Sequence, residues 1–176
     1  MKKALVFLFM LAIAKCCFTQ TKGQMEKRFD PACVPKDILN KDYTLLVKIH
    51  HKKDSWVKKY TETMEKHYAG KFEIVPSDVS TKDAYPDSTK YRYLLLVNYA
   101  GSHSAEFSRV KPVTVFNPQG VGTVSTPHYA LYIIDRQNNG NGVYTGLESA
   151  KVIKIAAFVA DKLSGKEGGE EEEDKD

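Results

Sequence analysis

The sequence predicts an α/β fold: a two-layer sandwich in which a mixed sheet of about five to six strands carries two helices on one face. Two observations lead to this prediction. An apolar strand, an amphipathic helix and a second strand follow one another over residues 42–76, the pattern of a parallel βαβ unit. Further strand patterns then lead to a second amphipathic segment, which ends the body.

A strand and an amphipathic helix open the body. Residues 42–50 (DYTLLVKIH) hold a short β-rich apolar run, which predicts a strand buried on both faces. Asp54 or Ser55 is expected to cap the helix that follows, and Gly70 to end it in the left-handed conformation. Between these ends, large side chains recur every four residues and form one apolar stripe: Trp56, Tyr60, Met64 and Tyr68.

Three strand patterns follow this helix. Residues 71–76 predict the second parallel strand, and residues 91–99 give the strongest strand pattern in the chain because β-branched and aromatic residues surround an apolar centre. Residues 111–116 predict a further strand, which Pro112 restricts to an edge or to a strand start because proline has no N–H to donate.

A hairpin and a helix complete the body. Residues 127–137 and 143–145 flank an Asn- and Gly-rich segment at 138–142, which predicts a hairpin turn because these residues tolerate positive φ. Residues 149–163 place their apolar side chains on one broad face and predict the second helix.

Composition divides the chain into four parts. Residues 1–19 predict a signal peptide, and residues 20–40 a flexible tether. Residues 41–165 are long enough for one α/β domain with its own core. Residues 166–176 carry seven acids against two lysines, although the whole chain has a net charge of +4. This tail is expected to be disordered and the body to be mildly basic.

The first residues predict export. Lys2 and Lys3 precede the apolar run Ala4–Ala14, which is shorter than the roughly 20 residues that span a bilayer. Cleavage near Thr19 would give a free periplasmic or secreted protein.

The alternative to a free protein is a lipoprotein anchored at Cys16. An acyl chain on this cysteine would hold the domain on a membrane surface. Lys15 argues against it, because the lipobox pattern has a small residue at that position. In the free form Cys33 is the one remaining thiol, which excludes an internal disulfide framework. It is expected to be a free thiol rather than a nucleophile, and a mixed disulfide with a partner is its more plausible active role.

No catalytic, metal or cofactor site is predicted. His50 and His51 are adjacent, so on a strand they would point to opposite faces and could not chelate one ion together. HExxH, GxSxG and glycine-rich phosphate motifs are absent from the sequence. A secreted hydrolase with a dispersed site is the alternative, and it would require His103 or His128 to meet a carboxylate.

Basic residues gather between residues 48 and 59. They could form a surface for an anionic partner, either an acidic protein or an anionic membrane surface. Export argues against nucleic acid as that partner. The residues of this candidate surface are Lys48, Lys52, Lys53, Lys58 and Lys59.

The end of the body resembles a known module. The run YALYIIDRQNNGNGVYTG, followed by SAKVIKIAAFVADKLSG, is similar to the end of the small α/β module at the N-terminus of TolB and, more loosely, of the envelope lipoproteins CsgG and LpoB. Ile134-Asp135 and Ala160-Asp161 match its aliphatic-Asp and Ala-Asp positions. The resemblance implies an exported domain that lacks catalysis and binds other envelope proteins; it supplies no binding residue.

Together these features predict an exported, non-enzymatic interaction module of the cell envelope with a protein partner and no cofactor. The hydrolase and the anionic membrane-surface binder remain the alternatives.

Overall fold

One mixed sheet forms the middle of the fold. The structure is a computed structural model and describes residues 21–99, 129–138 and 140–166. The five strands of these ranges are arranged in the order β2-β1-β3-β4-β5. In chain order the elements are α2 (Lys22–Arg28), the 3₁₀ turn η1 (Pro31–Cys33), β1 (Thr44–Lys48), α3 (Asp54–His67), β2 (Lys71–Val75), α4 (Thr81–Ala84), β3 (Tyr93–Tyr99), β4 (Tyr129–Asp135), β5 (Asn141–Ser149) and α5 (Val152–Leu163).

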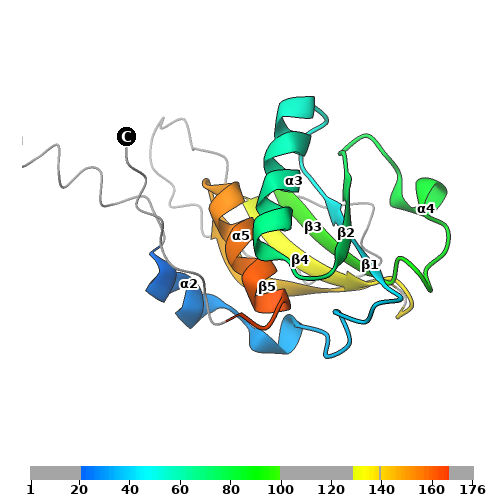
Figure 1. Ribbon diagram of the computed structural model, residues 1–176. Helices are drawn as coiled ribbons and strands as arrows, with labels where there is room; N and C mark the ends of the chain where they lie inside the picture. The colour runs from blue at the N-terminus through cyan, green and yellow to red at the C-terminus, as the bar shows by residue number, and fades with distance from the viewer. Residues whose placement is uncertain (1–20, 100–128, 139, 167–176) are drawn as a thin grey trace, which may run out of the picture.

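The predicted fold class is confirmed. β1 pairs in parallel with β2 and with β3, whereas β3, β4 and β5 pair antiparallel, so the sheet is mixed. The βαβ unit is present, with α3 as its crossover. Figure 1 shows α3 and α5 side by side on one face of the open sheet. The strand predicted at 111–116 lies outside the described residues.

β1 is buried on both faces, as its continuous apolar run predicts. Leu45, Val47 and Ile49 belong to the core beneath the two helices, and Leu46 belongs to a second cluster on the opposite face. Alternation along a strand sends neighbouring side chains to opposite faces, so a strand covered on both sides needs apolar residues at every position. The connection from β2 to β3 contributes Tyr85 to this second cluster.

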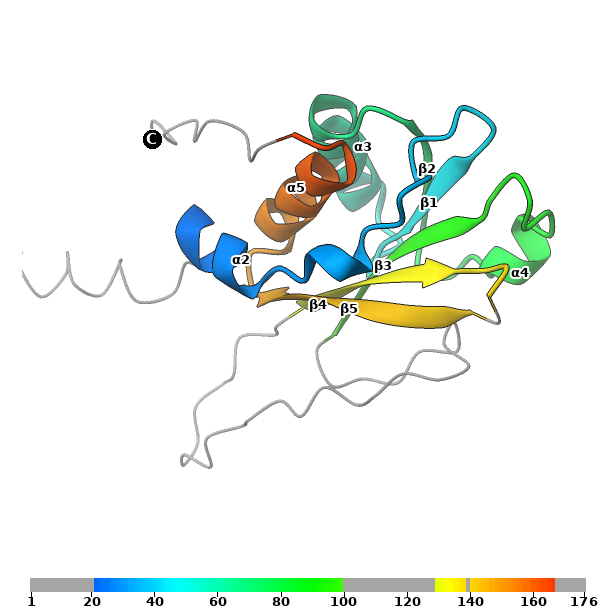
Figure 2. The ribbon, with the colours of Figure 1, turned by 90° about the horizontal axis from the view of Figure 1, so that it is seen from below.

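The N-terminal segment, residues 21–40, is folded, so the prediction of a flexible tether is wrong. α2 begins with a capping box between Thr21 and Gln24. The segment lies beside β5 and α5 (Figure 2), and the Phe29 ring meets the ring of Phe158 edge to face at 5.8 Å between centroids. Although the segment is mostly polar, four of its apolar side chains are buried: Met25, Phe29, Cys33 and Ile38.

A glycine makes this close packing possible. The Asp30 N–H donates to the Thr145 carbonyl oxygen at 3.0 Å, which brings the N-terminal backbone against β5. Gly146 has a φ of 83°, and a Cβ at this position would overlap the carbonyl oxygen of Arg28. Only glycine combines this conformation with so close an approach of two backbones.

The ends of α3 differ from the prediction. The helix begins at Asp54 after Lys53, which makes no side-chain capping bond, so neither Asp54 nor Ser55 is the cap. It ends at His67, and Gly70 is not left-handed. A Cβ at Gly70 would lie 2.8 Å from the Tyr68 ring, so the glycine makes room for a buried aromatic side chain instead.

The C-terminal hairpin and helix are confirmed with shifted bounds. Gly140 takes a φ of 65° in the predicted turn between β4 and β5. β5 extends over 141–149, beyond the predicted 143–145, because β4 pairs with it from Asn141 to Ser149 and the N-terminal segment bonds to it at Thr145. α5 begins at Val152, three residues later than predicted.

Candidate functional site

The basic surface predicted from residues 48–59 is divided in the structure. Lys48 lies on β1 with its side chain on the sheet face opposite α3, where its Nζ donates to the Val79 carbonyl oxygen at 2.6 Å. Alternation along the strand explains this, since Lys48 follows Leu46 on the same face. Lys48 is therefore separated from the lysines before and on α3, and its inclusion in one surface with them is wrong.

Lys58 is also set apart. It lies on the side of α3 that carries acidic residues, because positions three or four apart share a helix side. Its Nζ is 3.8 Å from a Glu62 carboxylate oxygen, and both side chains are largely exposed. The residues on this side of the helix are mixed in charge and net acidic: Asp54, Lys58, Glu62 and Glu65.

The neighbouring side of α3 carries two lysines, and Glu62 lies at its border, three residues after Lys59 and four before Lys66. Lys59 and Lys66 are seven residues apart, lie on the same side as Trp56, and are exposed. Lys52 and Lys53 are exposed just before the helix, and Lys166 lies at its other end, where its Nζ donates to the carbonyl oxygens of Lys66 and His67 at 3.3 and 3.2 Å. We call these five residues the lysine stripe: Lys52, Lys53, Lys59, Lys66 and Lys166.

Aromatic rings support the start of the stripe. The His51 ring stacks on Trp56 with centroids 5.7 Å apart and ring planes within 4°. The Lys59 Nζ lies 5.3 Å from the centroid of the Trp56 ring, a cation-π contact. Trp56 is therefore covered by its own neighbours, and it holds Lys59 in place.

His50 lies under this stack. Its ring is 4.8 Å from Trp56 and 4.2 Å from Tyr129 between centroids, and its Nδ1 is 3.4 Å from the Tyr60 hydroxyl. Burial, with a smaller effect of His51, lowers the pKa of His50 from 6.5 to about 4. The side chain is neutral at neutral pH and packs as a half-buried ring among its aromatic neighbours.

The sequence predicted that the two histidines would point to opposite faces of a strand. In the structure their rings lie side by side. Their ring centroids are 5.3 Å apart because β1 ends at Lys48, before strand alternation could separate them. Even so, no group of three or more His, Cys, Asp or Glu side chains in the described part of the chain could hold a metal ion.

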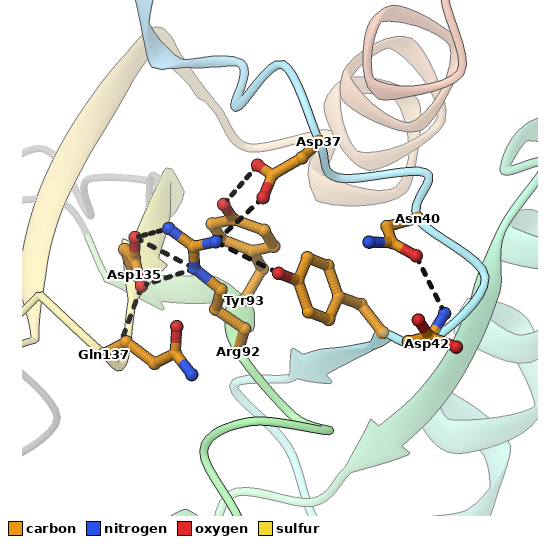
Figure 3. A network of polar contacts seen from close by, with 8 residues as sticks. Asp37, Asn40, Asp42, Arg92, Tyr93, Asp135 and Gln137 are labelled. Carbon is orange, nitrogen blue, oxygen red and sulfur yellow. Dashed lines mark hydrogen bonds and ion pairs between the residues drawn. The ribbon is translucent and has the colours of Figure 1, made fainter.

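The largest polar network lies at the other end of the sheet (Figure 3). Arg92 donates from Nε and Nη2 to Asp135, and from Nη1 to Asp37 at 2.8 Å and to the Tyr43 hydroxyl at 3.2 Å. The Tyr93 hydroxyl donates to Asp37 at 2.6 Å, and this bond is the main cause that lowers the pKa of Asp37. Each charged group is matched by an internal partner, so the network joins the N-terminal segment to β3 and β4 and offers no free charge to a ligand.

A serine, a histidine and an aspartate also meet where α3 and α5 end. The His67 Nδ1 is 3.0 Å from an oxygen of Asp161, which is 5% exposed. The Ser164 hydroxyl, however, donates to the carbonyl oxygens of His67 and Ala160 and accepts from the Ala69 N–H. A nucleophile must be hydrogen-bonded to the base side chain, and Ser164 is not, so the cluster joins two helix ends.

The cysteine that remains in the free form is buried. Cys33 is 3% exposed in the core, where burial and the charge of Asp30 raise the pKa of its thiol to about 12. Cys33 is a free thiol, as expected. A mixed disulfide with a partner needs an accessible thiolate, so this active role does not fit the buried position. Cys16, His103 and His128 lie outside the described residues.

What this arrangement can do is bind negative charge. Lysine ammonium groups are strongly hydrated point charges that bind carboxylates or phosphates. The sequence located Lys52, Lys53 and Lys59 but missed Lys66 and Lys166. The spacing of seven residues between Lys59 and Lys66 was the signal for the first; the second lies beside α3 only because α5 ends there.

Comparisons with protein-family models, with curated proteins and with solved structures find no match to this chain. Within residues 21–99, 129–138 and 140–166, no helix has the length and apolar character to cross a membrane.

Proposed function

We propose that this chain is an exported, non-enzymatic interaction module of the cell envelope, similar to the N-terminal module of TolB, and that it binds an acidic segment of a protein partner through the lysine stripe. The observation that carries the proposal is the row of exposed lysines before α3, along it and at its end. These are the residues of the lysine stripe, with Glu62 at its border.

The length of this row of lysines favours an elongated acidic ligand. The lysines from Lys53 to Lys66 extend over 13 helical residues, or about 20 Å at a rise of about 1.5 Å per residue. An extended peptide advances about 3.3 Å per residue, so six or seven residues would follow the stripe. Binding of this kind is electrostatic and is weakened by salt.

A protein partner is favoured over a membrane surface because of Trp56. Binding at a membrane surface is strongest when an aromatic side chain can enter the headgroup region beside the lysines. The Trp56 ring is stacked on His51 and lies beside Tyr60, so it supports the site from within.

The test is a binding titration with a fluorescent deca-glutamate peptide. We expect the variant Lys59→Gln/Lys66→Gln to lose most of the affinity that the natural chain shows at low salt. Lys58→Gln is the matched control, because it removes the same charge from the neighbouring side of the same helix. Equal losses in Lys58→Gln and Lys59→Gln would mean that only net charge matters and would contradict a defined site.

Vesicles test the membrane alternative. We expect no binding to vesicles of phosphatidylcholine and weaker binding to vesicles of phosphatidylglycerol than to the peptide. Stripe-dependent binding to phosphatidylglycerol alone would replace the protein partner with a membrane surface.

Export and partner are tested in cells. The intact mass of the mature protein should begin near Gln20 and carry no lipid. Crosslinking from position 59 should capture an envelope protein with an exposed acidic segment, and crosslinking from position 58 should not.

A further inference from the structure

We propose that β2 forms the interface of a symmetric dimer, in which the β2 strands of two copies of this chain pair antiparallel with Phe72 at the two-fold axis. An unpaired strand edge and a match of side chains in one register support this dimer. The sheet of one copy would then continue into the sheet of the other. This interface is separate from the lysine stripe and does not depend on the partner proposed for it.

β2 is an edge strand whose outer backbone groups are unpaired. It pairs with β1 on one side and with no other strand of the described ranges. The Ile49 N–H donates to the Val75 carbonyl oxygen at 2.9 Å, so the backbone groups of Val75 face β1. These groups alternate in direction along a strand, and those of Phe72 and Ile74 therefore face away from the sheet. In the described part of the chain they have no backbone partner there.

The two edges of the sheet differ in how they are covered. At β5, the Asp30 N–H donates to the Thr145 carbonyl oxygen, so the N-terminal segment covers part of that edge. No described segment makes such a bond to the outer side of β2. An open strand edge is a template for pairing with another chain. Phe72 and Ile74 are only half-buried against the core beneath α3, and pairing at β2 would cover both.

The charged side chains of β2 lie on the other face of the sheet. Val75 belongs to the cluster opposite the helices, so Lys71 and Glu73 point to that face as well. Within the described ranges neither of them is in an ion pair. The Lys71 Nζ donates to the Lys41 carbonyl oxygen at 2.8 Å, and Glu73 accepts from the Tyr91 hydroxyl at 3.1 Å. Each charge has a neutral partner and can still form an ion pair.

One symmetric register satisfies both the backbone and the charges. Residues whose backbone groups face outwards form the hydrogen-bonded pairs of an antiparallel ladder, and their neighbours form the pairs in between. With Phe72 at the two-fold axis, Lys71 of each copy lies opposite Glu73 of the other, and Gly70 lies opposite Ile74. The outward pairs then have all their N–H groups, and two cross-strand ion pairs form.

The other two-fold positions along β2 are unfavourable. An axis at Lys71 or at Glu73 places like charges directly opposite each other, which is destabilising. An axis nearer the C-terminal end of β2 pairs Phe72 or Ile74 with Pro76, which has no N–H to donate. The charges and the proline therefore select the register centred on Phe72.

Sedimentation velocity of the purified protein measures the dimer, and a charge swap tests the register. Lys71→Glu and Glu73→Lys each place like charges opposite each other at two positions, so we expect each to raise the dimer dissociation constant at least about tenfold. The double variant Lys71→Glu/Glu73→Lys restores both ion pairs with reversed signs and should return the constant to within about threefold of the natural value. Lys27→Glu is the control, because it makes the same charge change on α2, beside the opposite edge of the sheet, and should leave the constant unchanged.

Cysteine crosslinking tests the same register independently. Lys71→Cys and Glu73→Cys would place thiols opposite each other in a pair without hydrogen bonds, with Cα atoms about 4.5 Å apart and within disulfide range. Two copies of the same variant would hold their thiols diagonally, about 7–8 Å apart. An equal mixture of the two variants should therefore give more disulfide-linked dimer under mild oxidation than either variant alone. The natural chain under the same oxidant gives the background from its own cysteines.

The outcomes separate the interface from its alternatives. A dimer that weakens in both single variants and returns in the double variant supports pairing through β2. Protein that sediments as a monomer up to millimolar concentration overturns the dimer. A dimer that keeps its dissociation constant in both single variants, or that crosslinks no better in the mixture than in each variant alone, overturns the register and places the interface elsewhere.

Discussion

The N-terminal segment and the outer sides of α3 are both polar and lysine-containing in the sequence, yet the fold uses them in opposite ways. In residues 21–40, four apolar side chains are buried and Asp37 is bound to Arg92 and Tyr93. On α3, Lys59 and Lys66 are exposed on the surface of the body. The position of a few side chains, rather than average composition, therefore decides which polar segment is structure and which is surface.

The largest effect is expected from the apolar attachment of the N-terminal segment. Phe29→Ala leaves a cavity beside Phe158 and should lower the free energy of unfolding by about 3 kcal/mol, measured by urea denaturation. Leu39→Ala is the matched control, because Leu39 is 42% exposed and should cost less than about 0.5 kcal/mol. Similar losses in both variants would mean that the segment is not packed as described.

The Arg92 network, which joins the N-terminal segment to β3 and β4, should contribute somewhat less to the free energy of unfolding. Arg92→Met removes the donor to Asp37 and Asp135 and leaves two carboxylates without their charged partner, which should cost about 2 kcal/mol. Adding Asp135→Asn should recover part of this loss, because it removes one uncompensated charge. A double-mutant cycle between Arg92 and Asp135 measures the coupling, and a coupling near zero would contradict the network.

His50, whose ring lies beneath the lysine stripe, should make the free energy of unfolding depend on pH. Above pH 6.5 His50 is neutral in the folded and unfolded chain; between pH 6.5 and about 4 only the unfolded chain binds the proton, so stability falls as the pH falls. The slope should be about 1 kcal/mol per pH unit, slightly below the value for one full proton because His50 is partly exposed.

Two variants test this assignment by thermal melts across the same pH range. His50→Phe keeps a ring in the core and should flatten the slope. His51→Gln keeps His50 buried and should retain most of it. If the pH dependence of stability persists in His50→Phe, it arises from another titratable group and the assignment to His50 is wrong.

The smallest effect on stability is expected from the lysine stripe itself. Lys59→Gln and Lys66→Gln should each change the free energy of unfolding by less than about 0.5 kcal/mol, because exposed charges contribute little to folding. A loss above 1 kcal/mol in either variant would place that lysine among the structural residues, together with Arg92. Circular dichroism melts are sufficient to detect it.

Local periodicity predicted the elements well, and long-range packing explains where it failed. The four-residue spacing of Trp56, Tyr60 and Met64 predicted α3, and the uninterrupted run in β1 predicted a strand buried on both faces. The N-terminal segment was misjudged because it is held by α5 and β5, which come last in the sequence: Phe29 packs against Phe158, and Asp30 bonds to Thr145.

The part of the candidate site that depends on local sequence was predictable, and the part that depends on long-range packing was not. Lys52, Lys53 and Lys59 are close in sequence, so their grouping required only the helix. Lys48 was misassigned because strand alternation reverses its direction, and Lys166 was missed because it reaches α3 through the packing of α5. The Arg92 network joins residues from three distant segments and could not be located before the strand order was known.

The backbone contact between Asp30 and Thr145 also has a consequence for the order of folding. The first described residues to be synthesised are held by the last strand of the sheet, beside the glycine that lets them approach. They have no native surface to pack on until nearly the whole chain has been made. Such non-local contacts slow folding, because distant parts of the chain must meet before the contacts can stabilise anything. Residues near Asp30 therefore cannot take their final place until β5 has been made, although they precede it by more than a hundred residues.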